Sequence, residues 1–73
     1  MRQGNYLVDA AQELKKAVTE HPYAAEAHLS LAKLYADEFY QIDLARQQYR
    51  KVLELSPSHP QATAIRFWLA AHP

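Results

Sequence analysis

The chain has 73 residues and no cysteine, and its eight Lys and Arg balance eight Asp and Glu. This length allows one small domain, and the absence of cysteine excludes disulfides and thiolate metal sites. The balanced charge argues against nucleic acid and anionic membranes as partners, because affinity for phosphates needs an excess of cations. No apolar run approaches the roughly 18 residues of a membrane span, so we expect no membrane insertion. The first residues lack the apolar block of a secretory signal, which makes a cytoplasmic location the default expectation and a removed leader the alternative.

Apolar residues at three- and four-residue spacing predict four helices and no strand, so the expected fold class is all-α. The predicted helices cover residues 5–20, 24–38, 42–55 and 60–71. Asn5 is the expected N-cap of the first helix, and His21-Pro22 ends it because the residue before proline is disfavoured in the α region. Pro60 suits the first position of the fourth helix, where its missing N–H leaves no hydrogen bond unmade. We expect these helices to form a single domain over residues 1–73.

The second predicted helix has an unusually broad apolar face. It carries two adjacent stripes, one of Ala27, Leu31 and Leu34 and one of Ala32 and Tyr35. A face of this width needs a neighbouring helix on each side, and loops of a few residues make those neighbours antiparallel. The sequence therefore predicts a row of helices, each beside the next, rather than a closed bundle.

Two parts of the sequence repeat. A shift of 35 positions superimposes the first predicted helix on the third, pairing Ala10 with Ala45, Gln12 with Gln47, Leu14 with Tyr49, Lys15 with Arg50, Lys16 with Lys51, Ala17 with Val52, Val18 with Leu53 and Pro22 with Pro57. A weaker match, at a shift of 38, links residues 21–32 with residues 59–70. Repetition at this spacing is typical of arrays of helix pairs.

The second and third helices resemble the tetratricopeptide repeat, a helix pair of about 34 residues with the pattern W-x₂-L-G-x₂-Y…A-x₃-F…P. The matching residues here are His28, Leu31, Ala32, Tyr35, Ala45, Tyr49 and Pro57, preceded by a half repeat with Ala10, Leu14 and Pro22. His28 departs from the pattern, because a large apolar residue is usual there, and the turn before Ala45 is one residue longer. The resemblance covers residues 6–60 and implies stacked antiparallel helix pairs of an α-solenoid, with the fourth helix as a cap.

The resemblance also implies a function. In this family the first helix of each repeat lines a groove that takes a peptide or a partner's helix, so the expected partner is a protein or peptide. The candidate partner-binding residues lie on the side of the second helix away from its two core stripes, and they are Glu26, Leu29, Lys33, Ala36 and Asp37, with Ser30 among them. We expect an exposed leucine and alanine flanked by charges. The alternative is that this side of the helix is merely solvated.

Self-association is the second candidate function. Stacked repeats usually need at least three copies to be stable alone, and the sequence contains one complete repeat. The first helix should therefore expose a face that a homo-oligomer or a longer array would cover. Phe67 is the candidate oligomer contact, because it cannot share the core stripe of its neighbour Trp68.

No catalytic, cofactor or metal site is expected, so the chain is predicted not to be an enzyme. Its histidines, His21, His28, His59 and His72, include no pair with the i, i+4 spacing of a helical zinc site. RNA binding by a helical-repeat protein ranks last among the candidate functions. It needs a basic groove, whereas this groove would have one lysine and two acids.

Overall fold

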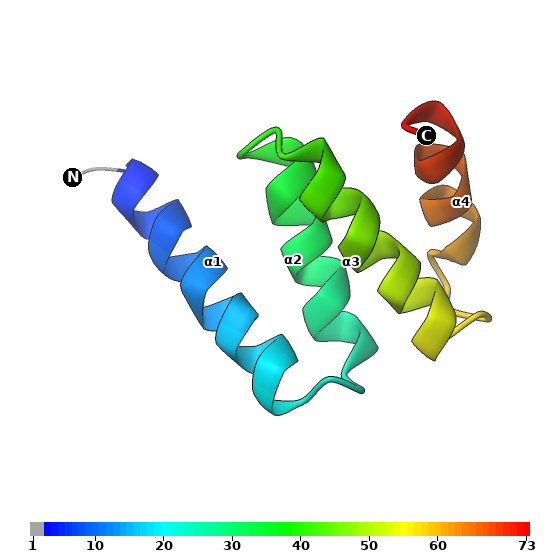
Figure 1. Ribbon diagram of the computed structural model, residues 1–73, viewed down its shortest axis with the longest axis horizontal. Coiled ribbons are helices and arrows are strands. Elements are labelled where there is room, and N and C mark those ends of the chain that lie inside the picture. Colours follow the sequence, from blue (N-terminus) through cyan, green and yellow to red (C-terminus); the bar gives the residue numbers. More distant parts are fainter. Residues whose placement is uncertain (1–2) are drawn as a thin grey trace.

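The computed structural model describes the backbone of residues 3–73 and the side chains from Tyr6 onward. It contains four helices, which are α1 (Gln3–Glu20), α2 (Ala25–Asp37), α3 (Ile42–Leu55) and α4 (Ala62–Ala71). No strand occurs between residues 3 and 73. The all-α prediction is confirmed, and each predicted helix is present (Figure 1). None of the four helices is both long and apolar enough to span a membrane.

Two helix starts differ from the prediction. The helix α1 begins at Gln3, so Asn5 lies inside it and is not its N-cap. The helix α4 begins at Ala62, so the prediction that Pro60 is its first residue is wrong. The chain makes a turn here instead, in which the Ala62 N–H donates to the carbonyl oxygen of His59 over 2.8 Å. The Gln61 N–H donates to Nδ1 of His59 over 3.0 Å, which holds Pro60 and Gln61 in the turn.

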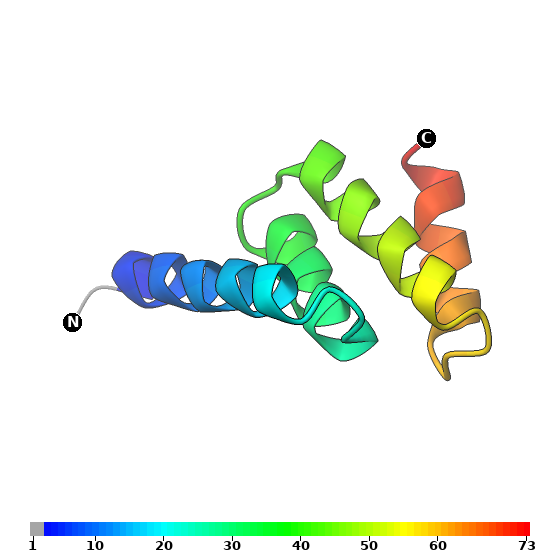
Figure 2. The ribbon, with the colours of Figure 1, turned by 60° about the horizontal axis from the view of Figure 1, so that its bottom comes forward.

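The helices lie in a row in chain order (Figures 1 and 2). Contacts between helices join α1 to α2, α2 to α3 and α3 to α4, and α2 with α3 is the most extensive of these pairs. The helix α1 is close to α2 near the turn that joins them and diverges from it toward the N-terminus (Figure 1). This arrangement agrees with the broad apolar face of α2, which meets one neighbour on each side.

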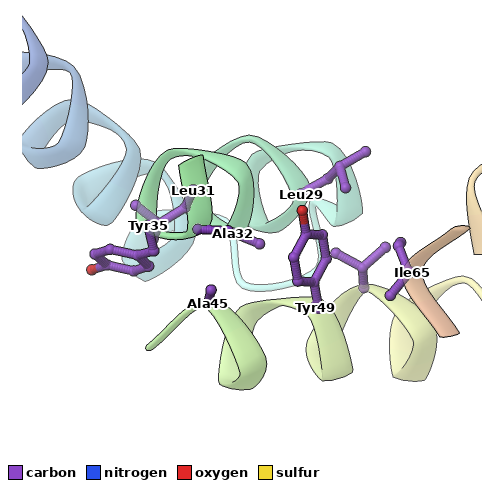
Figure 3. Close-up of a cluster of buried hydrophobic side chains, with 9 residues drawn as sticks. Leu29, Leu31, Ala32, Tyr35, Ala45, Tyr49 and Ile65 are labelled. Carbon is purple, nitrogen blue, oxygen red and sulfur yellow. The ribbon is translucent and has the colours of Figure 1, made fainter. Parts of the chain in front are cut away.

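The core is centred on the contact between α2 and α3. Ala32 and Ala45 are completely buried there, and Figure 3 shows Ala45 pointing from α3 toward α2 beside Ala32. Two methyl groups at this place allow the helix axes to approach closely. The buried cluster consists of Leu29, Leu31, Ala32, Tyr35, Ala36, Ala45, Tyr49, Val52 and Ile65.

His28 is buried at a position where the repeat pattern usually has a large apolar residue. Its Nε2–H donates to the carbonyl oxygen of Pro22 over 3.0 Å. Its Nδ1 lies 2.6 Å from the side-chain amide of Gln48 on α3, and with the ring proton on Nε2 this nitrogen accepts a hydrogen bond from the amide N–H. Both ring nitrogens thus have partners, which removes the cost of burying a polar ring. His28 connects the turn before α2 to α3.

The weaker repeat of the sequence has a structural counterpart in two turns. The Ala24 N–H donates to the carbonyl oxygen of His21 over 3.0 Å, and the Ala62 N–H donates to that of His59 over 2.8 Å. Both turns contain His-Pro, and both lead into a helix. The shift of 38 residues therefore relates α4 to α2, as the shift of 35 relates α3 to α1.

Candidate functional site

A shallow hollow of about 190 Å³ lies between α2 and α4 over the middle of α3. Lys33 contributes from α2, and α3 contributes Tyr49. Most of the wall comes from α4 and the turn before it, through Gln61, Ala64, Ile65 and Trp68. We call these six residues the α2–α4 groove. Figure 3 shows Tyr49 pointing from α3 toward α2, between Ala32 and Ile65.

Aromatic contacts fix Trp68 at one wall of the groove. Its ring is tilted by 49° against Tyr49, with 4.8 Å between the centroids, and it stacks on the ring of His72 at 4.2 Å. His72 is itself held because its Nδ1–H donates to the carbonyl oxygen of Trp68 over 2.9 Å. Arg46 of α3 donates to the carbonyl oxygens of His72 and Pro73 over 3.2 and 3.1 Å. The last turn of α4 is thereby tied to α3, which gives the indole a defined position.

The polar groups of the groove include an ammonium and a phenol. Lys33 is exposed, and between residues 6 and 73 no carboxylate lies within ion-pair distance of it. Burial raises the pKa of the Tyr49 hydroxyl, and the negative charge of Asp37 raises it further. The phenol therefore keeps its proton at neutral pH. The groove offers a positive charge and an O–H group beside an indole.

Glu26 has a structural partner rather than a free carboxylate. Its Oε2 lies 2.5 Å from Nε2 of His59, in the turn that precedes α4. The His59 side chain is buried, whereas that of Glu26 is exposed. This contact joins the first turn of α2 to the turn before α4.

Two of the predicted partner-binding residues are not on the surface. Leu29 is 4% exposed and Ala36 is 8% exposed, so the prediction that they form an exposed apolar anchor is wrong. With Ala32 they recur at three- and four-residue spacing and make a third apolar stripe on α2, which lies in the buried cluster. The other predicted residues, Glu26, Ser30, Lys33 and Asp37, are exposed. Phe67 is 74% exposed, as its assignment as an oligomer contact requires.

The prediction missed the contribution of α4 to the groove. Trp68 was expected in the core, and it is partly buried against the buried cluster but also lines the groove. The sequence contains a signal for this position. Glu26 and Ser30 lie on the expected groove side of α2. The shift of 38 residues makes Ala64 the equivalent of Glu26 and Trp68 the equivalent of Ser30. Applying the repeat to the candidate site therefore predicts two of the residues that α4 contributes to the groove.

A larger hollow of about 340 Å³ lies on the other side of α2, where α1 diverges. Its lining includes Val8, Ala11 and Lys15 of α1 together with Tyr35 and Phe39. It has no unpaired buried polar group, and we assign it to incomplete packing of α1. Between residues 6 and 73, no three His, Asp or Glu side chains gather as metal ligands would.

No family model, curated protein or solved structure matches this chain.

Proposed function

We propose that this chain is a non-catalytic, tetratricopeptide-like module that binds a peptide or protein segment in the α2–α4 groove. The observation that carries the proposal is the position of Lys33, a lysine without an ion-pair partner among the described side chains, across the groove from Trp68. Two further features support it. The helix-pair pattern from His28 to Pro57 resembles the repeat of that family, and residues of both α2 and α4 line the groove.

The groove residues define the chemistry of the segment that it would take. A carboxylate of the partner would pair with the ammonium of Lys33. An apolar side chain next to that carboxylate would lie against the indole of Trp68 and the methyl group of Ala64. The phenol of Tyr49 would donate to a backbone carbonyl or a second carboxylate oxygen. We therefore propose a short segment with adjacent acidic and apolar residues as the partner.

The single tryptophan of the chain provides the test. Peptides selected from a displayed random library on the native chain should change the emission of Trp68 as they bind. Lys33→Glu should weaken the selected peptides at least about tenfold, because it places like charges in contact. Lys16→Glu on α1 is the matched control, since it makes the same charge change away from the groove, and circular dichroism checks that both variants fold. Equal weakening by both variants would contradict the proposed site.

A further inference from the structure

The helix α1 has the sequence pattern of α3 but lacks one of its neighbours. Ala45 and Val52 of α3 are completely buried, because α3 lies between α2 and α4. Their equivalents at the shift of 35, Ala10 and Ala17, are only half-buried, since α1 has α2 alone beside it. Between these alanines lies Glu13, the equivalent of Gln48. We call Ala10, Glu13 and Ala17 the outer face of α1.

The helix α4 repeats α2 and also lacks a neighbour. The shift of 38 residues places Arg66, Phe67 and Ala70 at the positions of three residues of α2 that are buried in the α2–α3 half of the structure, His28, Leu29 and Ala32. On α4 the same three positions are exposed, and with Thr63 they border a shallow, mostly apolar hollow of about 350 Å³. We call these four residues the outer face of α4.

The side chains of the two outer faces are complementary, as those of α2 and α3 are where these helices pack. Ala32 of α2 and Ala45 of α3 lie at the close approach of these helices. Their equivalents on the outer faces are Ala70 and Ala10, so a contact between the faces would again have two methyl groups at this place. Phe67 is larger than Leu29, whereas Ala17 is smaller than Val52, so the bulk added on one face is removed from the other.

The polar pair of the α2–α3 contact has a charged counterpart. Within one copy, His28 of α2 lies 2.6 Å from Gln48 of α3. The equivalent residues on the outer faces are Arg66 and Glu13, which carry opposite charges. Among the described side chains neither has an ion-pair partner, and the Arg66 guanidinium only donates to the carbonyl oxygen of Pro57 over 3.3 Å. Each face therefore presents one charge that the other face can neutralise.

We propose that this chain associates head to tail, with the outer face of α4 of one copy on the outer face of α1 of the next. The new contact repeats the α2–α3 pair between two copies, and Arg66 of one copy pairs with Glu13 of the other. Because the two faces are different, a pair of copies still has one unused face of each kind, the α1 face on one copy and the α4 face on the other. Such contacts build open chains or closed rings rather than a symmetric dimer. The proposal is independent of the α2–α4 groove, which shares no residue with either face.

Charge reversal and mixing test the proposal. Sedimentation velocity of the native chain over a hundredfold range of concentration should show an average mass that rises past two copies. Glu13→Arg and Arg66→Glu should each raise the apparent dissociation constant at least about tenfold, because like charges then meet. An equimolar mixture of the two variants should associate again. In the mixture, the new glutamate on α4 of one variant meets the new arginine on α1 of the other, and the second contact is the native pair.

An aromatic substitution tests the apolar part of the contact. Phe67→Ser should weaken association at least about tenfold, because it removes the largest apolar side chain of the α4 outer face. Tyr23→Ser is the control, since Tyr23 is 85% exposed in the turn between α1 and α2, outside both faces. A native monomer at every concentration would overturn the proposal and leave the faces to a different occupant. A mass that stops at two copies, or a mixture that fails to associate, would also overturn it.

Discussion

The helices α1 and α3 carry the same pattern of residues in different surroundings. Ala45, Tyr49 and Val52 of α3 are buried between two helices, whereas their equivalents on α1, Ala10, Leu14 and Ala17, are half-buried against one. The pattern of apolar residues decides which side of a helix is able to pack, and the number of neighbours decides how much of that side is buried. Equivalent substitutions in the two helices should therefore have unequal effects on stability.

Truncation of the largest equivalent side chains should show the greatest difference. Tyr49→Ala removes a buried ring that packs on Trp68 and should lower the free energy of unfolding by about 3–5 kcal/mol. A single core of this size rarely supplies more than about 3–5 kcal/mol in total, so this variant should be largely unfolded. Leu14→Ala should cost less than about 2 kcal/mol, because Leu14 is only half-buried. Circular dichroism without urea shows whether Tyr49→Ala is unfolded, and urea unfolding in dilute solution measures the loss in Leu14→Ala. Two variants of equal stability would mean that α1 and α3 are equally well covered.

Equivalent alanines of α1 and α3 can be enlarged instead of truncating large side chains. Ala45→Leu puts three extra carbon atoms where α2 and α3 approach closely and should cost about 1–3 kcal/mol. Ala10→Leu should change the stability of the dilute chain by no more than about 0.5 kcal/mol, because Ala10 is only half-buried and no second helix covers that side of α1. Thermal melting of both variants checks this. A large loss for Ala10→Leu would show that the outer face of α1 is already packed within one copy.

The equivalent polar residues should differ by less. Gln48→Ala leaves Nδ1 of the buried His28 without its partner and should cost about 1 kcal/mol. Glu13→Ala should change stability by no more than about 0.5 kcal/mol, because Glu13 is exposed on a helix that accepts alanine readily. Chemical unfolding resolves this difference if both variants have the same dependence on denaturant. A Gln48→Ala variant as stable as the native chain would show that the contact with His28 contributes nothing.

The alkaline pH dependence should be the smallest effect, and it concerns α3 alone because α1 has Leu14 where α3 has Tyr49. Burial, and then the charge of Asp37, raise the pKa of Tyr49 above its usual value. The folded state therefore holds the phenolic proton more tightly than the unfolded state does. The associated stability is complete below the unfolded pKa of Tyr49 and is lost as the pH rises through the raised pKa of the folded state.

A substitution isolates the smaller of the two causes. Asp37→Asn should lower the pKa of Tyr49 only in part, because burial is the larger cause. The ultraviolet absorbance of tyrosinate, measured as a difference from Tyr49→Phe, gives this pKa. An unchanged pKa of Tyr49 in Asp37→Asn would mean that the charge of Asp37 does not act on the Tyr49 hydroxyl.

The helices were predictable from the sequence because apolar spacing and His-Pro turns are local features. The start of α4 was not, since the hydrogen bonds of the His59 turn decide where Pro60 lies. The burial of Leu29 and Ala36 was not predictable from two stripes on α2, because a third stripe is recognised only when α3 and α4 are in place. Trp68 was assigned to the core from its spacing, but its contacts with Tyr49 and His72 leave it lining the groove.

Disulfide trapping tests most directly whether the two ends of the chain form the pair that α2 and α3 form. The chain has no cysteine, so a variant with Ala10→Cys and Ala70→Cys contains only the two thiols of interest. The equivalent alanines, Ala32 and Ala45, lie at the close approach of two helices, where disulfide geometry is accessible. Our account predicts that mild oxidation yields a ladder of dimers, trimers and longer species. It also predicts that a control with Ala10→Cys and Ala71→Cys, one residue further along α4, yields much less. No ladder, or equal ladders from the two variants, would contradict the head-to-tail contact.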